Sequence, residues 1–196
     1  MDFKTQLSPA AGLAGLTTDA LLVVLVGPAV PAGLDKTVGG LLSDAVKQGD
    51  FEFKAGRCLY LHRPANVKAA RLAFAAAADG SAKAFKAAVA AALGQLKALG
   101  VVDLAVASVG GEALTAAHAE ALVAATGDAV YVYRHTKPSA PTAPKLASVS
   151  LVAAKAQVAA LTKGLRQGQA VAAGVALARE FGNRPGNHAT PSYLAA

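Results

Sequence analysis

The sequence predicts an α/β fold: a three-layer sandwich with a mainly parallel or mixed sheet of five to six strands, helices on both faces, and one long helix after it. Two observations predict the layers. Short, continuously apolar runs such as Ala20–Val26 alternate with stretches of helical periodicity, and a long alanine-rich stretch follows the last strand. The 196 residues are enough for one domain with a core and an extension.

Six segments have the pattern of strands. Uninterrupted apolar runs rich in β-branched residues are typical of strands buried on both faces, and we expect the run after Gly56 to be one of these. The first segment alternates weakly and predicts a short strand. The expected strands are Phe3–Leu7, Ala20–Val26, Gly56–Leu61, Arg71–Ala78, Val101–Ala107 and Ser148–Ala153.

Two helices carry clear start and stop signals. Asp35 is an N-cap before a run of helical periodicity, and Gly49 ends that run. Asp79-Gly80-Ser81 forms a turn and the N-cap of a second helix, which Gly100 closes. The inward residues are Val38, Leu41, Leu42, Ala45 and Val46 in the first helix, and Phe85, Val89, Ala92, Leu93 and Leu96 in the second.

A third helix is expected from Glu112 toward Tyr133. The second half has two interpretations over residues 127–135, because Val130–Tyr133 follows Thr126-Gly127 and could form a strand instead. The residues expected to face inward are Leu114, Ala117, Ala121 and Leu122.

A long helix is expected over 155–182, after a proline-rich loop at 138–144. Gly164 and Gly168 lie four residues apart on one face of it. That spacing either lets another backbone approach closely or simply weakens the helix.

We place the domain boundary near residue 154, which divides the chain into 1–154, 155–182 and 183–196. A separate apolar stripe consists of Val158, Leu161, Leu165, Ala172 and Val175.

The net charge of +7 lies in the C-terminal third. Residues 134–196 hold eight Lys and Arg and one acid, Glu180, whereas the charges of residues 1–133 balance. Three interpretations remain open: a solvated face, a nucleic-acid surface, or a linker that lies against an acidic partner domain. Tyr131 and Tyr133 are the only aromatic pair near these basic residues, whereas single-strand binders interleave aromatics. The basic residues most relevant to nucleic acid are Lys145, Lys155, Lys163 and Arg166.

The single cysteine and the start of the chain favour a cytoplasmic protein. Cys58 excludes an internal disulfide and is expected to be a small buried residue in a strand. The first residues lack the basic and apolar regions of a secretory signal. No apolar run has membrane-spanning length, so we expect no membrane partner.

Residues capable of catalysis do not assemble into a recognisable site. Asp50 and Glu52 could face one side of a strand, but no third ligand is near. Ser108 does not lie in the G-x-S-x-G turn of a hydrolase, and Cys58 has no evident base. We therefore assign no catalytic, cofactor-binding or metal-ligating residue to this chain. The histidines, expected to be exposed or half-buried and lacking the spacing of zinc ligands, are His62, His118, His135 and His188.

The loop Ser108-Val109-Gly110-Gly111 is the one candidate ligand site. It follows a strand and precedes a helix, where α/β folds bind phosphates on backbone amides. Two glycines are also an ordinary way to turn the chain. A nucleotide or ADP-ribose site is therefore one alternative for this loop.

The segment from Gly174 to Ala195 carries a resemblance to a known family. It contains Ala178-Arg179-Glu180 at the end of a helix, and its other matching residues are Asn183, Pro185, Asn187, Thr190-Pro191 and Leu194-Ala195. This pattern resembles the segment that leads into the catalytic domain of the cytosol (leucyl) aminopeptidases. Weaker similarities are Gly49-Asp50-Phe51 before one strand and Arg71 at the start of another; departures are Phe181, Gly182 and Arg184.

The resemblance implies a non-catalytic N-terminal domain, similar to macro domains, joined by a long helix to a separate catalytic domain. Thr190-Pro191 opens a helix that the sequence does not complete, so we expect this chain to be a fragment. The parent would be a homo-hexamer that removes N-terminal residues from peptides with two divalent metal ions, zinc or manganese. No position here matches the family's catalytic motif, so no metal ligand is carried over.

Overall fold

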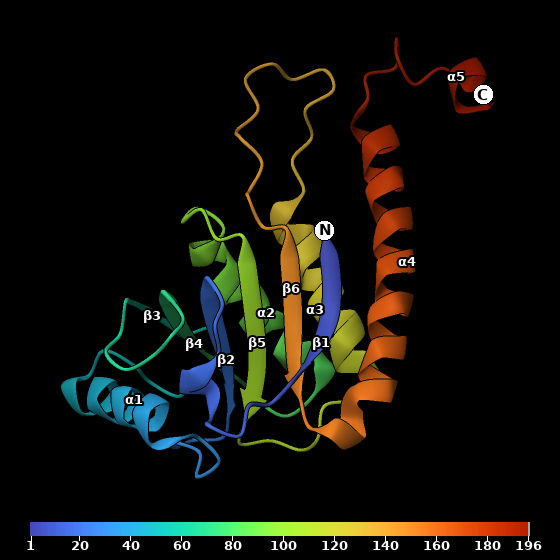
Figure 1. Ribbon diagram of the computed structural model, residues 1–196. Helices are drawn as coiled ribbons and strands as arrows, with labels where there is room; N and C mark the ends of the chain where they lie inside the picture. Colours follow the sequence, from blue (N-terminus) through green and yellow to red (C-terminus); the bar gives the residue numbers. More distant parts are fainter. Residues whose placement is uncertain (196) are drawn as a thin grey trace.

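The computed structural model describes residues 1–195 as a six-stranded mixed sheet between helices (Figure 1). The strand order is β1-β6-β5-β2-β4-β3; all neighbours are parallel except the antiparallel pair β3 and β4. This confirms the predicted α/β sandwich. Ala196, the last residue of the predicted segment 183–196, lies outside the described residues. The elements are β1 (Asp2–Leu7), η1 (Leu13–Gly15), β2 (Ala20–Val26), α1 (Lys36–Gln48), β3 (Cys58–His62), β4 (Arg71–Ala77), α2 (Ala82–Leu96), β5 (Asp103–Val109), α3 (Ala116–Val130), β6 (Ser148–Ala153), η2 (Lys155–Gln157), α4 (Val158–Asn183) and α5 (Pro191–Ala195).

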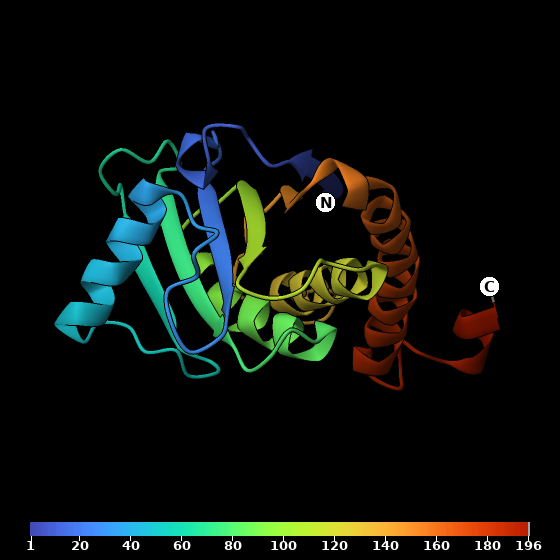
Figure 2. The same ribbon diagram turned by 90° about the horizontal axis from the view of Figure 1, so that it is seen from below.

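The core lies on both faces of the sheet, with β2 at its centre. Leu21, Val23 and Leu25 of β2 pack toward α1 on one face. Leu22 and Val24 point to the other face, which α2, α3 and α4 cover. Figure 2 shows α1 separated from these three helices by the sheet. Because alternate side chains enter two cores, β2 is apolar without interruption, as its sequence predicts.

Local signals fix several boundaries where the sequence places them. The runs predicted for β2 and β6 have the same bounds in the structure. Asp35 caps α1 by accepting a hydrogen bond from the Val38 amide at 2.9 Å, and Gly49 ends the helix with a left-handed φ of 80°. Ser81 caps α2 in the same way, through the Ala84 amide. Helix α2 ends at Leu96, and Gly100 closes the turn after it rather than the helix itself.

One predicted strand has a different environment. The run from Gly56 was expected to form a buried strand, but β3 begins at Cys58, is half-buried and lies at the edge of the sheet. It pairs only with β4, in the antiparallel direction, because a short connection after His62 returns the chain directly into β4. A strand with one neighbour remains partly open to solvent.

The third predicted helix is correct in place but wrong in detail. Helix α3 begins at Ala116 rather than Glu112 and continues to Val130; Tyr131 is extended, and residues 131–134 form no strand. Its inward face also differs. Ala117 is exposed and Ala121 is half-buried; the buried residues of the helix are His118, Ala119, Leu122, Val123, Ala125 and Thr126.

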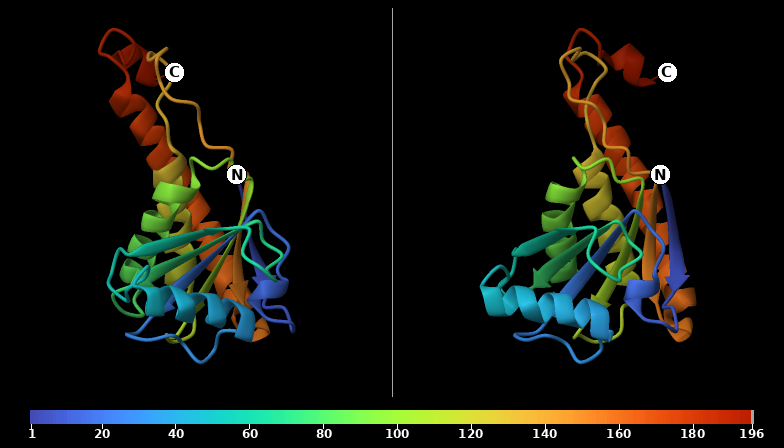
Figure 3. Two further views of the ribbon diagram at one scale, coloured as in Figure 1. Left: turned by 90° about the vertical axis from the view of Figure 1, so that its left-hand side faces the viewer. Right: turned by 60° about the vertical axis from the view of Figure 1, so that its left-hand side comes forward.

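Helix α4 confirms the long helix predicted after the last strand. The short turn η2 precedes it, and the helix itself has 26 residues. Its first half packs on α3 and β1, and its second half runs past the end of the sheet (Figure 3). Leu161 and Leu165 of the predicted stripe are buried, whereas Val175 is exposed. Among the described residues, no helix is long and apolar enough to cross a membrane.

Candidate functional site

Two glycines hold the first half of α4 against α3 at backbone distance. A Cβ added at Gly164 would lie 2.8 Å from the Cα of Ala116, closer than real Cβ atoms approach. A Cβ at Gly168 would lie 3.0 Å from the Cα of Glu120. The structure therefore selects the first of the two interpretations of this glycine pair: close approach of another backbone. We call the packing of Gly164 and Gly168 on α3 the glycine contact.

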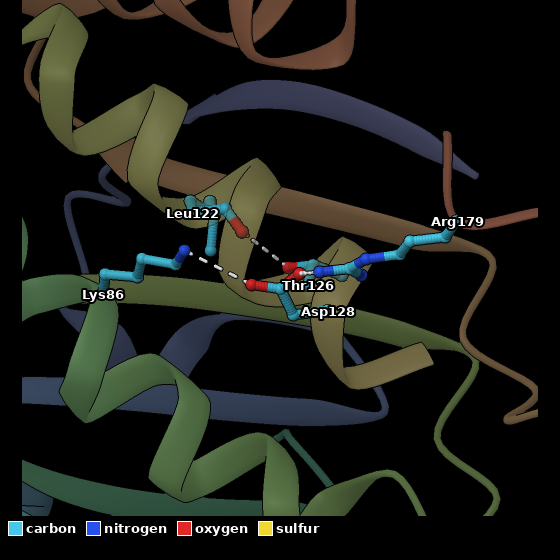
Figure 4. A network of polar contacts seen from close by, with 5 residues as sticks. All are labelled: Lys86, Leu122, Thr126, Asp128 and Arg179. Atoms are coloured by element: carbon cyan, nitrogen blue, oxygen red, sulfur yellow. Dashed lines mark hydrogen bonds and ion pairs between the residues drawn. The ribbon is translucent and has the colours of Figure 1, made fainter. Parts of the chain in front are cut away.

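Polar side chains hold the second half of α4. The Asp128 carboxylate at the end of α3 accepts a hydrogen bond from Arg179 Nη2 of α4 at 2.5 Å. Its other oxygen lies 3.3 Å from Lys86 Nζ of α2. Figure 4 shows Asp128 between the two cations, with the Thr126 hydroxyl donating to the Leu122 carbonyl beside it. One carboxylate thus joins three helices.

Tyr131, directly after α3, completes this group of contacts. Its hydroxyl donates to Glu180 Oε1 at 3.2 Å and accepts from Asn183 Nδ2 at 3.1 Å. The Arg179 guanidinium lies 5.5 Å from the centroid of the same ring, within cation–π range. We call the set formed by Asp128, Tyr131, Arg179, Glu180 and Asn183 the polar cluster.

The electrostatics of the polar cluster favour an ionised Asp128. Partial burial acts to raise the pKa of this carboxyl, but the hydrogen bonds from Arg179 and Lys86, together with their charges, outweigh burial and lower it. The side chain is 44% exposed, so water screens the pairs and each is worth little stability. The geometry therefore points to orientation of a helix rather than to proton transfer.

A groove of about 630 Å³ lies between the glycine contact and the polar cluster. Its lining comes from α2, α3 and α4 and consists mostly of alanine, glycine and valine, with charged groups such as Lys83 and Glu120 among them. The polar groups that converge at one end of this groove, Lys86, Asp128 and Arg179, pair with one another and connect the helices, so the groove gives no support to a catalytic assignment. The groove is the space between α3 and α4 where the two helices diverge beyond the glycine contact.

The predicted phosphate loop has a structural explanation without a ligand. Gly110 has a left-handed φ of 92°, and an added Cβ there would overlap the carbonyl oxygen of Val26. A Cβ at Gly111 would lie 3.2 Å from the Val26 side chain. The two glycines are needed because the end of β5 passes close to the end of β2. They give no support to the ADP-ribose alternative.

The remaining predicted candidates stay apart from one another. Asp50 and Glu52 precede β3 rather than lying on a strand, and both are exposed. Hydrogen bonding to Lys54 and the charges of Lys54 and Arg57 lower the pKa of Glu52. Within residues 1–195, no three His, Cys, Asp or Glu side chains form a group that could hold a metal ion.

All four histidines were expected to be exposed or half-buried, and for His118 this prediction is wrong, because its side chain is buried. Its Nδ1 accepts a hydrogen bond from the Thr115 amide at 3.2 Å, and its Nε2 lies 3.0 Å from the Gly80 carbonyl oxygen. Both contacts together require a neutral ring with its proton on Nε2. This histidine therefore ties the start of α3 to the turn before α2.

The other histidines and the cysteine lie outside any such arrangement. His135 and His188, distant in sequence, approach with ring centroids 5.9 Å apart, and His62 contacts Tyr60. Cys58 is half-buried in β3, and burial raises the pKa of its thiol to about 11. The thiol is protonated at neutral pH and is a poor nucleophile.

The basic residues of the C-terminal third are distributed rather than gathered. Lys145 and Lys155 lie beyond opposite ends of β6, a separation of roughly 20 Å for a six-residue strand. Lys163 and Arg166 are exposed on α4. Arg179 is paired with Asp128. The four basic residues named for nucleic acid therefore lie on separate elements, which does not favour that alternative.

Comparison with known proteins identifies the family. The sequence profile described as "Cytosol aminopeptidase family, N-terminal domain" matches residues 22–139, more than half of the chain. The chain belongs to the cytosol aminopeptidase family. The resemblance first seen in the segment after Gly174 is thereby confirmed, and the matched part is the family's N-terminal domain rather than its catalytic one.

Full-length relatives of the family are much longer than this chain. The whole chain is 55% identical to a probable cytosol aminopeptidase of Methylibium petroleiphilum and spans 40% of it. Over 89% of its length it is 34% identical to the cytosol aminopeptidase of Pseudomonas aeruginosa, of which the match spans 38%. A mutant of tomato leucine aminopeptidase has the same fold, with a TM-score of 0.75 at 20% identity over all of this chain and 40% of that one.

The polar cluster connects the family's sequence pattern to the structure. Arg179, Glu180 and Asn183, noted above only as matches to the aminopeptidase segment, are the α4 residues that contact Asp128 and Tyr131. Sequence reasoning did not find their partners. One signal was available: Asp128 and Glu180 are the only acids in residues 121–196, and both lie in the polar cluster.

Proposed function

We propose that this chain is the non-catalytic N-terminal domain and connecting helix of a cytosolic metal-dependent aminopeptidase. Membership of the family through its N-terminal domain, with 40% of a relative's length covered, is the observation that carries the proposal. In the proposed division, residues 1–154 form the N-terminal domain, 155–182 the connecting helix and 183–196 the start of the catalytic domain.

The proposed parent enzyme hydrolyses the N-terminal peptide bond with two divalent metal ions, zinc or manganese, which supply an activated water and polarise the carbonyl. The ligands for those ions would come from polypeptide outside this chain. The parent is proposed to be a homo-hexamer in the cytoplasm.

The contribution of this chain is proposed to be positional. The glycine contact fixes where α4 leaves the sheet, and the polar cluster fixes its direction at the far end. A helix held at Gly164 and Gly168 and again at Arg179, Glu180 and Asn183 transmits the orientation of the α/β domain to whatever follows Asn183. The domain would thereby set how the catalytic part is approached and how subunits are arranged.

A peptidase assay tests the proposal directly. The purified chain and the full-length protein are each incubated with leucine p-nitroanilide in manganese or zinc, with and without a chelator. We expect hydrolysis by the full-length protein alone and its loss with the chelator. Chelator-sensitive hydrolysis by the 196-residue chain would contradict the non-catalytic assignment, and an inactive full-length protein would contradict the proposed activity.

A further inference from the structure

We propose that the outward face of the second half of α4, formed by Ala170, Ala173, Gly174 and Leu177, is the surface on which the catalytic part of the parent polypeptide packs. The inference rests on the proposed function, because it assigns that function's missing domain to a particular surface. It goes beyond that function because it names the residues of α4 on which the catalytic part would pack.

The composition of this half of the helix is the first observation. Residues 169–178 contain no charged residue, and every one except Gln169 is Ala, Val, Leu or Gly. Yet Leu177, on the outward face, is 57% exposed. A helix that is apolar on all sides is normally buried in the folded protein. This stretch therefore requires a cover that the α/β domain does not supply.

The first half of the same helix provides a comparison along the same face. Lys163 and Arg166 point outward there and are exposed, and no charged residue follows until Arg179, which turns back toward Asp128. A Cβ added at Gly174 would meet nothing within 4 Å, unlike one at Gly164. The outward face thus changes from charged to apolar where α4 leaves the domain.

The chain after α4 contacts the helix one turn beyond this face. Phe181 follows Leu177 by one helical turn, and its ring lies 6.2 Å from that of Tyr193 in α5. The Arg184 guanidinium lies beside both rings, 5.8 Å from the Phe181 centroid and 4.8 Å from the Tyr193 centroid. Downstream polypeptide therefore contacts α4 at Phe181, and Figures 1 and 2 show α5 beyond the end of α4, on the side away from the sheet.

The small size of the face favours an occupant that is covalently attached. Ten helical residues extend about 15 Å. One side of such a helix offers a few hundred Å², below the roughly 800 Å² per partner of a stable separate complex. A domain tethered a few residues away needs less area, because the tether supplies an effective concentration of about a millimolar or more. The polypeptide that follows α5 meets this condition.

Cysteine labelling tests the inference. Leu177→Cys and Lys163→Cys are each made in a Cys58→Ala background, in the 196-residue chain and in the full-length protein, and their reaction with a maleimide is timed. We expect Leu177→Cys to react roughly ten or more times more slowly in the full-length protein than in the chain. Lys163→Cys, on the charged part of the same face, should react equally fast in both.

Equal, rapid labelling of Leu177→Cys in both proteins would overturn the inference. Protection that disappears when the full-length protein is diluted to monomers would also overturn it, because the cover would then be another copy. Hydrogen exchange of residues 169–178 in the unsubstituted proteins gives the same test without a variant, with slower exchange expected in the full-length protein.

The two proposals fail in different ways. An active full-length protein whose Leu177→Cys variant is labelled rapidly refutes this inference and leaves the proposed function standing. Protection of that cysteine in a full-length protein without peptidase activity refutes the proposed activity and leaves the packing surface standing. A reading frame that ends at Ala196 would refute both.

Discussion

The two halves of α4 are held to the same domain by different physical means. In the first half, Gly164 and Gly168 let the helix backbone touch α3, and Leu161 and Leu165 fill the core beside them. In the second half, hydrogen bonds and ion pairs at Asp128 and Tyr131 span a groove that apolar side chains do not fill.

This difference separates anchoring from orientation. Close packing in a dry contact depends on shape and is insensitive to salt, whereas half-exposed ion pairs are weak and screened. The first half should therefore contribute most of the unfolding free energy that α4 provides. The second half should set the orientation of the helix and contribute little to that free energy. Four measurements can break or sharpen this distinction.

Substitution of Gly164 by alanine should have the largest effect. The new methyl group would meet the Ala116 backbone, which cannot move aside as a side chain can. We expect a loss of about 1–3 kcal/mol in unfolding free energy, measured by urea denaturation, even though alanine favours helix.

Gly174→Ala is the matched control for that substitution. It lies on the same helix with open space around it, so it should stabilise the chain by about 0.5–1 kcal/mol. Equal effects of the two substitutions would show that the glycine contact is not a close packing site.

Replacing Asp128 by asparagine should have a smaller effect on global stability. The pairs with Lys86 and Arg179 are half-exposed, so the loss should be below about 1 kcal/mol. Amide hydrogens of residues 179–183 should nevertheless exchange several-fold faster, because the free energy of local opening at the end of α4 falls by about the same amount. Glu112→Gln removes an equal charge from an exposed acid that forms no ion pair in residues 1–195, and it should change neither quantity.

The contribution of Asp128 to the unfolding free energy should depend on pH, and this effect should be smaller than that of the substitution itself. Its pKa is lowered in the folded chain, so its stabilisation is complete above the ordinary carboxyl value of about 3.9 and is lost as the pH falls through the folded value. The difference in unfolding free energy between the unsubstituted chain and Asp128→Asn should be constant from pH 7 to about pH 5 and then shrink toward pH 3. A difference that grows on acidification would contradict the assigned direction.

The smallest effect is expected for Tyr131→Phe. It removes the hydroxyl that contacts Glu180 and Asn183 but keeps the ring beneath Arg179, and should cost about 0.5 kcal/mol or less. Exchange at the end of α4 should rise slightly. Tyr133→Phe, which loses a hydrogen bond only to Thr136, should leave that exchange unchanged.

The fold was predictable where short-range signals and burial agree. The bounds of β2 follow from its unbroken β-branched run, and those of α1 from Asp35 and Gly49, because each signal acts within a few residues. The inward face of α3 was not predictable. In an alanine-rich helix the apolar contrast between faces is too weak to distinguish Ala117, which is exposed, from Ala119, which is buried.

The polar cluster required the folded structure. Asp128 and Arg179 are 51 residues apart, and their pairing depends on the close approach of α3 and α4 at the glycines. The sequence showed Gly164 and Gly168 as a pair that could admit another backbone, but not which backbone. It showed Arg179 and Glu180 as part of a family pattern, without the side chains that they contact.

The pairing of β1 with β6 has a consequence for biosynthesis. Every residue of β1 lies opposite one in β6, and Thr5 also contacts Thr162 of α4. The pairing partner of β1 is therefore synthesised only about 140 residues after β1 itself. During synthesis β1 stays unpaired while the strands between it and β6 are made, and synthesis of β6 supplies the partner that completes this edge of the sheet.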